Sequence, residues 1–161
     1  MHPAPPVRPA PDEARPRAGR PLVLIADDYP ENRRLLTIYL REHYDLLEAA
    51  TAEEALDLLR EHPVALAILD LNFCDGMSGI DAVQQIRCEP GLAATRVLAL
   101  TAYAYPDDRD RCIEAGFDDY ISKPVFKAAL LEKVATLLAP PPQGDGSTGE
   151  IGHVWITRKR D

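Results

Sequence analysis

Acidic side chains follow two apolar runs of this chain and could together bind a hard cation. Asp27 and Asp28 come directly after the apolar run 22–26, and Asp70 follows the apolar run 64–69. Each run has the length of a short buried strand. If these strands are parallel neighbours, their carboxylates meet at one edge of a sheet and supply the oxygen ligands that hard divalent cations prefer. One carboxylate could then act as a nucleophile toward phosphorus.

Two further polar side chains are expected at the same edge. Thr101 follows the apolar stretch 96–100, and Lys123 closes the stretch that begins at Phe117. A cation held by Asp28 and Asp70, with Asp27 nearby, would neutralise charge on phosphoryl oxygens. The ammonium group and the hydroxyl group could bind the remaining oxygens. This set of side chains suits phosphoryl transfer to the Asp70 carboxylate.

Each of these residues also has a purely structural interpretation. Asp27 or Asp28 could cap the helix that follows, Thr101 could simply end a strand, and Lys123 could lie in a solvated turn. In that case four strands would end, by coincidence, in compatible polar groups at the same edge. The combination therefore favours a phosphoryl-transfer site.

The elements that must position these side chains alternate between strand and helix patterns. Five strand patterns alternating with five helix patterns predict an α/β fold with a parallel sheet covered on both faces. In the flavodoxin-like, doubly wound order 2-1-3-4-5, the first and third strands are neighbours where the chain reverses direction, and ligands bind there. The expected strands are 21–26, 44–49, 64–69, 96–100 and 117–121, and the expected helices are 30–42, 51–62, 78–88, 106–116 and 126–138.

Local signals indicate where several helices begin and end. Pro30 suits a first helical turn, Thr51 and Glu54 have the spacing of a capping box, and Gly116 suits a left-handed cap. The first helix is expected to bury one apolar face, which comprises Leu35, Leu36, Tyr39 and Leu40.

The sequence of 161 residues predicts one domain, flanked by two segments of different composition. Residues 1–20 are rich in proline and arginine and predict a disordered arm. The domain is expected over 21–139. Residues 140–161 read as a linker followed by a short strand-like segment that contains Trp155. That segment could pair with a second copy of the chain, dock on a partner, or remain a flexible tail.

Charge and composition narrow the function class. Residues 1–20 carry a net charge of +2, and residues 140–161 carry a net charge of 0. Because the whole chain has a net charge of −8, residues 21–139 carry −10. An acidic domain argues against nonspecific nucleic-acid binding. No apolar run approaches the ~20 residues of a membrane span, and no secretory signal is recognisable. The three cysteines have no metal-ligand or disulfide spacing, so we expect small apolar side chains, buried or half-buried, in a cytoplasmic protein.

Five short motifs occur in order between residues 21 and 139. They are Leu-Ile-Ala-Asp-Asp (24–28), Ile-Leu-Asp-Leu-Asn (68–72), Met-Ser-Gly (77–79), Ala-Leu-Thr-Ala (99–102) and Tyr-Ile-Ser-Lys-Pro (120–124). In these motifs and their spacing, the domain resembles a receiver domain of a bacterial two-component response regulator.

The resemblance implies a metal site and a phosphorylation site. Mg²⁺ or Mn²⁺ would be bound by Asp28, Asp70 and the backbone carbonyl of Asn72, while Asp27 would act mostly through water. Asp70 would take a phosphoryl group from a phosphohistidine of a sensor histidine kinase or a histidine phosphotransfer protein. The protein would then be a switch that catalyses only its own phosphorylation and dephosphorylation, and not an enzyme acting on other substrates.

The resemblance also implies how the signal would be read. Thr101 and Lys123 would bind the phosphoryl group, and Tyr120 would swing inward when Thr101 moves. The fourth helix, fifth strand and fifth helix would form the face that an effector or a second copy recognises. The stretch 27–34 resembles receivers of relay and hybrid-kinase type, which favours a role in a phosphorelay. Only about 22 residues follow the fifth helix, too few for a helix-turn-helix module, so we expect a single-domain regulator without an output domain. Tyr103, two residues past Thr101, would slow loss of the phosphoryl group, or would be a surface tyrosine without a kinetic role.

One stretch departs from the pattern of the family. Receivers usually have eight residues from the nucleophile to the glycine that opens the third helix, whereas Asp70 and Gly79 are nine apart. Cys74 replaces the usual proline, and Gly76 looks like the inserted residue. Because the insertion comes after Asn72, we expect the metal-binding carbonyl to stay in place and the loop to bulge beyond it.

Two other function classes remain open from the sequence. One is a metal-dependent phosphohydrolase with an aspartyl nucleophile. Such enzymes usually carry a second aspartate two residues after the first, where this chain has Asn72. The other is a docking module that never accepts phosphate.

Overall fold

Five strands alternate with five helices along the computed structural model, which describes residues 19–102 and 106–140. Most of the expected arm, Tyr103 and the C-terminal segment with Trp155 lie outside the described residues. The strands are β1 (Leu22–Ala26), β2 (Asp45–Ala49), β3 (Leu66–Asp70), β4 (Arg96–Thr101) and β5 (Asp119–Ser122). The helices are α1 (Pro30–Leu40), α2 (Ala52–Glu61), α3 (Gly79–Cys88), α4 (Pro106–Ala115) and α5 (Lys127–Leu138).

The strands form one parallel sheet with the order β2-β1-β3-β4-β5, which confirms the predicted flavodoxin-like fold. The register explains how distant residues meet at one edge. Ala26 is level with Leu69, so the residue after β1 comes to lie beside the last residue of β3. On the other side of β3, Asp70 is level with Leu100. The carboxyl ends of β1, β3 and β4 therefore meet at one edge of the sheet.

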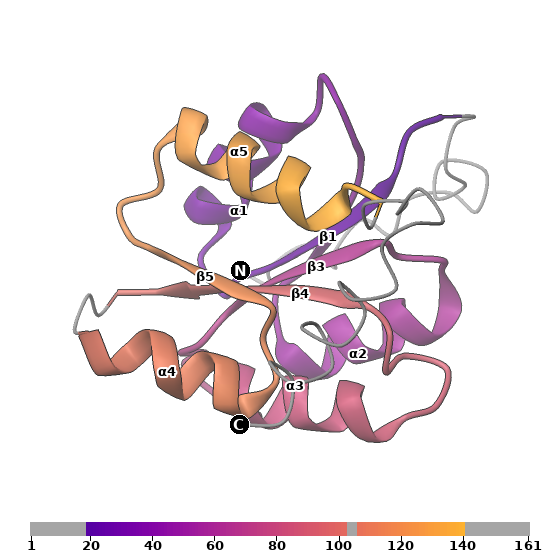
Figure 1. The fold of residues 1–161 in the computed structure, drawn as a ribbon, viewed down its shortest axis with the longest axis vertical. Coiled ribbons are helices and arrows are strands. Elements are labelled where there is room, and N and C mark those ends of the chain that lie inside the picture. The colour runs from indigo at the N-terminus through magenta and orange to yellow at the C-terminus, as the bar shows by residue number, and fades with distance from the viewer. Residues whose placement is uncertain (1–18, 103–105, 141–161) are drawn as a thin grey trace, which may run out of the picture.

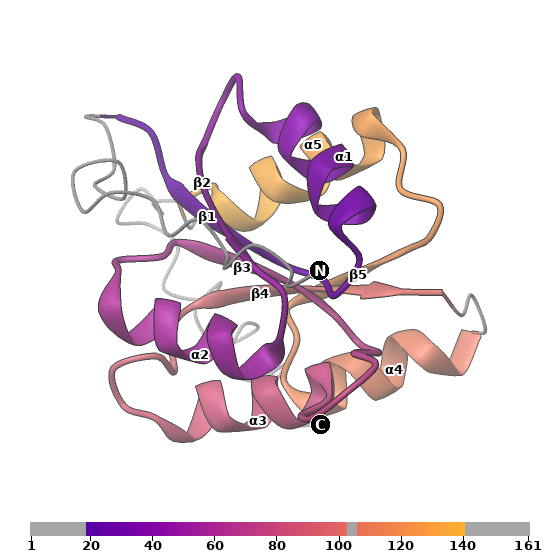
Figure 2. The ribbon, with the colours of Figure 1, turned by 180° about the vertical axis from the view of Figure 1, so that it is seen from behind.

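Helices cover both faces of the sheet. Helices α1 and α5 lie on one face, and α2, α3 and α4 lie on the other (Figures 1 and 2). Alternate strand residues point to opposite faces, so Leu24 and Leu69 pack under the three-helix layer while Ile25 and Ile68 pack under the two-helix layer. None of the described helices is long and apolar enough to cross a membrane.

Three expected boundaries differ from the structure by two residues each. The strands β3 and β5 begin later than predicted, and α1 ends at Leu40. At the start of β5, the Phe117 N–H donates to the Cys112 carbonyl of the preceding helix, so this buried residue belongs to the helix cap. Gly116, with a φ of +121°, makes the left-handed turn that the sequence predicted.

Two local expectations about helices need correction. Leu35 is 40% exposed, whereas Leu36 and Leu40, four residues apart, form the buried stripe of α1. At the start of α2, the Thr51 hydroxyl accepts from the Glu54 N–H as predicted. The Glu54 carboxylate, however, accepts from the N–H of Ala50 instead of closing a capping box on Thr51.

Arg87 stabilises the edge of the sheet opposite the carboxylates. The Arg87 guanidinium of α3 donates to three backbone carbonyls and to the Asp118 carboxylate, which also accepts from the Val97 N–H. The three carbonyls belong to Gly116, Ala93 and Thr95, at 2.8, 2.9 and 2.6 Å. This network ties α3 to the loops before β4 and β5.

Candidate functional site

Three carboxylates converge at the carboxyl end of the sheet. Oxygen atoms of Asp27, Asp28 and Asp70 lie within 4.8 Å of one another. Asp70 is the last residue of β3, and the other two follow β1 directly. Asp27 and Asp70 are buried and Asp28 is half-buried. Such a cluster repels itself unless positive charge is present.

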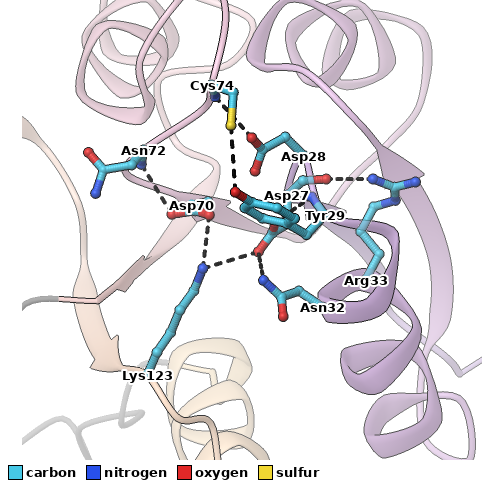
Figure 3. A network of polar contacts seen from close by, with 9 residues as sticks. All are labelled: Asp27, Asp28, Tyr29, Asn32, Arg33, Asp70, Asn72, Cys74 and Lys123. Atoms are coloured by element: carbon cyan, nitrogen blue, oxygen red, sulfur yellow. Dashed lines mark hydrogen bonds and ion pairs between the residues drawn. The ribbon is translucent and has the colours of Figure 1, made fainter.

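Lys123 supplies positive charge to two of these carboxylates. Its Nζ lies 2.9 Å from Asp70 Oδ2 and 3.3 Å from Asp27 Oδ2, between the two side chains (Figure 3). Lys123 can reach them because it directly follows β5. Burial lowers the pKa of the Lys123 ammonium, but the attraction of Asp70 and Asp27 outweighs burial and raises that pKa above its ordinary value.

Several hydrogen bonds hold Asp27 in place. Its Oδ1 accepts from the Tyr29 N–H at 2.9 Å, and its Oδ2 accepts from Asn32 at 3.2 Å as well as from Lys123. Arg33 donates to its backbone carbonyl at 2.6 Å. Burial still raises the pKa of Asp27, and the neighbouring charge of Asp70 raises it further. Ionisation of Asp27 is therefore less favourable in the folded protein than in an exposed aspartate.

Asp28 presents an oxygen that fits a cation. Its Oδ2 accepts from the Cys74 N–H at 2.9 Å, whereas its Oδ1 is buried and has no hydrogen-bond partner among the described residues. Burial raises the pKa of Asp28, but the hydrogen bonds from Cys74 outweigh it and lower the pKa. A buried carboxylate oxygen without a donor, close to two other carboxylates, is suited to a hard divalent cation. The residues present thus fit Mg²⁺ or Mn²⁺.

The β3–α3 loop approaches the site closely. The Asn72 N–H donates to Asp70 Oδ1 at 3.1 Å. A Cβ at Gly79 would lie 2.1 Å from the Asp70 carbonyl oxygen, so only glycine fits where α3 begins. Ser78 and Asp81 form a capping box at the start of this helix. The Asn72 N–H thus lies beside Asp70, and Gly76 further along the loop has a φ of +80°, while the place of the Asn72 carbonyl in a metal site stays a prediction.

Thr101 and Tyr120 occupy the neighbouring strand ends. Thr101 is fully buried at the end of β4, and its carbonyl accepts from the Lys123 N–H at 2.7 Å. Tyr120 in β5 is half-buried and packs against the core under α2, α3 and α4. The structure thus brings Thr101 next to Lys123, whereas the inward movement of Tyr120 stays a prediction.

Several residues near the site were not predicted from the sequence. Asn32 and Arg33 belong to the stretch 27–34 that resembles relay-type receivers, so this resemblance could have pointed to them.

The expectation that all three cysteines are at least half-buried was wrong, because Cys74 and Cys88 are exposed and only Cys112 is buried. Cys74 lies in the β3–α3 loop beside Asp28, where its N–H donates to the Asp28 carboxylate and its thiol lies 3.8 Å from the Tyr29 hydroxyl.

Residues 23–135 match the family model described as the Response regulator receiver domain. The chain belongs to this family. This receiver domain is 39% identical over 121 residues to the response regulator protein PilR of Pseudomonas aeruginosa, a match that covers 74% of the chain and 26% of PilR. The match covers 44% of the transcriptional regulatory protein KdpE of Mycobacterium tuberculosis, so the chain spans less than half the length of both relatives.

Two solved structures bear on the site of the receiver domain. One is the receiver domain of the sensor histidine kinase PA1611 from Pseudomonas aeruginosa, solved with a magnesium ion coordinated in its active-site cleft. It is 25% identical, with a TM-score of 0.68 and coverage of 74% of this chain and 98% of that one. The other is a chain of the co-crystal structure of the Saccharomyces cerevisiae phosphotransfer protein Ypd1 with the receiver domain of Ssk1. It is 30% identical, with a TM-score of 0.66 and coverage of 72% and 87%.

Proposed function

We propose that this receiver domain is a magnesium-dependent phosphoryl acceptor in two-component signalling, phosphorylated on Asp70. The observation that carries the proposal is the convergence of three carboxylates from β1 and β3 with the Lys123 ammonium from the end of β5. An acidic cluster with one ammonium group can hold a cation and a phosphoryl group together. The buried but hydrogen-bonded Asp70 carboxylate is the nucleophile.

Asp28, Asp70 and the backbone carbonyl of Asn72 are the proposed ligands of Mg²⁺ or Mn²⁺, with Asp27 acting through water. The buried Oδ1 of Asp28, which has no donor among the described residues, supports a direct contact. Both oxygens of Asp27 already accept hydrogen bonds, which supports an indirect role. When bound, the cation neutralises charge on the phosphoryl oxygens as they approach the carboxylates.

The proposed donor is a phosphohistidine of a sensor histidine kinase or a histidine phosphotransfer protein. The co-crystal structure of Ypd1 with Ssk1 supports a donor of this kind. The Asp70 oxygen attacks phosphorus while the P–N bond breaks, and the imidazole keeps the electron pair and takes up a proton. Lys123, already 2.9 Å from Asp70, then binds a phosphoryl oxygen in place of the carboxylate.

The proposed output is a change of one face of the domain. The Thr101 hydroxyl turns to a phosphoryl oxygen, and Tyr120 packs into the space that Thr101 leaves. The face formed by α4, β5 and α5 then binds an effector protein or a second copy. The phosphoryl group leaves by hydrolysis within the same site, and the reactions we propose for the domain are its own phosphorylation and dephosphorylation.

Phosphoryl uptake can be tested directly on the whole chain. The protein is incubated with acetyl phosphate and Mg²⁺, and its intact mass is measured. We expect the mass of one added phosphoryl group, absent from Asp70→Asn and absent when EDTA replaces Mg²⁺. The control Asp57→Asn removes an exposed carboxylate of α2 and should gain the group as the wild type does. Turnover of phosphate esters would instead indicate a hydrolase, and neither mass gain nor turnover would indicate a docking module.

A further inference from the structure

The β3–α3 loop, residues 71–78, holds two of the site carboxylates through its backbone. Near its start, the Asn72 N–H donates to Asp70 Oδ1 at 3.1 Å. In its middle, the Cys74 N–H donates to Asp28 Oδ2 at 2.9 Å. The second bond orients Asp28 so that its other oxygen is buried without a donor. The path of this loop therefore decides where the proposed metal ligand points.

A carboxylate from outside the site fixes the far half of the loop. Glu53 Oε1, from the first turn of α2, accepts from the Met77 N–H at 2.8 Å. The same carboxylate packs against the inserted residue, because a Cβ at Gly76 would lie 2.6 Å from Glu53 Oε1. This hydrogen bond lowers the pKa of Glu53, so the side chain is ionised at neutral pH.

From Asp70 to Gly79 the chain is one residue longer than the family pattern, so we expect the loop to need an anchor. A longer loop has more conformations to lose when it orders, and Gly76, with a φ of +80°, adds freedom of its own. Within the part of the chain that the structure describes, no other hydrogen bond joins residues 75–78 to an element outside the loop and α3. Phe73 and Met77 also pack against the core, and this apolar contact is the alternative anchor.

We infer that Glu53 is a positioning residue for the metal site: by holding Met77 it fixes the bulge at Gly76 and keeps the Cys74 N–H on Asp28. This inference rests on the function proposed above, since it gives Glu53 a role only if Asp28 is a metal ligand. Glu53 itself contacts neither the carboxylate cluster nor Lys123. Its effect reaches the site through the backbone of one loop.

The inference is tested by the Mg²⁺ affinity of the full chain, measured by titration calorimetry. Glu53→Ala should weaken Mg²⁺ binding by about tenfold, the lower end of the range for residues that orient metal ligands. Glu53→Gln should weaken it less, because its amide oxygen still accepts from Met77. Asp57→Asn, which removes the same charge one turn along α2, should bind Mg²⁺ as the wild type does.

A second measurement separates positioning from damage to the fold. At saturating Mg²⁺, Glu53→Ala should be phosphorylated by acetyl phosphate at the wild-type rate, and its unfolding temperature in EDTA should be unchanged. Its backbone amide signals for Cys74 and Met77 should shift in NMR spectra, while those of Asp57→Asn should not. These results together support the role of Glu53.

Other results overturn it. Wild-type Mg²⁺ affinity in Glu53→Ala would show that the apolar contacts of the loop suffice. Equal weakening in Asp57→Asn would show that net charge, not position, is responsible. If the wild-type chain itself binds no Mg²⁺, the proposed function fails, and this inference fails with it. If the wild type binds Mg²⁺ and Glu53→Ala binds it equally well, only this inference fails, so the two failures are distinguishable.

Discussion

Lys123 Nζ lies 2.9 Å from Asp70 Oδ2, although the two residues are 53 positions apart in the chain. The ammonium group also lies 3.3 Å from Asp27, so one cation serves two buried carboxylates. The site therefore contains its own counter-charge before any metal or phosphoryl group arrives. The same lysine stabilises the resting fold and, in the proposed mechanism, binds the transferred group.

Removing this lysine should destabilise the metal-free protein. We expect Lys123→Ala to lower the free energy of unfolding in EDTA by about 1–3 kcal/mol, because it leaves two buried carboxylates without their partly exposed cation. Saturating Mg²⁺ should recover much of the loss, because a divalent cation replaces the missing charge. Urea unfolding in EDTA and in Mg²⁺ measures both effects. Lys133→Ala, which breaks a more exposed pair with Asp119, should cost less than about 1 kcal/mol.

The raised pKa of Asp27 predicts that Asp27→Asn increases the free energy of unfolding by an amount that depends on pH. At any pH above its raised pKa, ionised Asp27 lowers the free energy of unfolding. This loss disappears as the pH falls from the raised pKa to the ordinary value of 3.8. In EDTA, the variant should therefore be more stable than the wild type at neutral pH, and the difference should shrink on acidification. Urea unfolding over a pH series measures the difference. A variant less stable than the wild type throughout would contradict the prediction.

Gly79→Ala should disturb both the fold and the site. Its new Cβ would lie 2.1 Å from the Asp70 carbonyl and 2.9 Å from Leu71 Cα, and neither backbone atom can move without shifting the strand end. We expect a loss of about 3 kcal/mol in the free energy of unfolding, together with weaker Mg²⁺ binding. Gly91→Ala is the matched control, because nothing lies within 4 Å of its added carbon. Thermal unfolding of the two variants should differ clearly.

Arg87→Ala should destabilise the sheet without affecting Mg²⁺ affinity. The guanidinium satisfies several half-buried acceptors at the edge of the sheet opposite the site, and their loss should cost about 2–4 kcal/mol. Arg96→Ala removes a longer, more exposed pair with the same Asp118 at 3.5 Å and should cost less than about 1 kcal/mol. Denaturant unfolding and Mg²⁺ titration of both variants test this. A change in metal affinity in Arg87→Ala would show that the two edges are coupled.

The sequence alone determined the fold class and the edge at which the acids gather. Apolar runs that end abruptly in Asp27, Asp70 and Thr101, alternating with helix patterns, predicted a parallel sheet with these residues at its carboxyl edge, and the structure has this arrangement. The ends of the helices and strands were predicted less well. The N–H of a residue such as Phe117 can donate to the preceding helix or belong to the next strand, and only the packed structure decides between these two.

Contacts between distant loops could be decided only by the tertiary structure. The sequence predicts an inserted residue near Gly76, but Glu53, whose carboxylate accepts from the Met77 N–H of that loop, reads there as an ordinary acid at a helix start. Likewise, no spacing rule places the Cys74 N–H on Asp28. Periodicity and turn chemistry act over a few neighbouring residues, so they define elements and the edges where these end. Which backbone amide meets which carboxylate depends on how the finished elements pack.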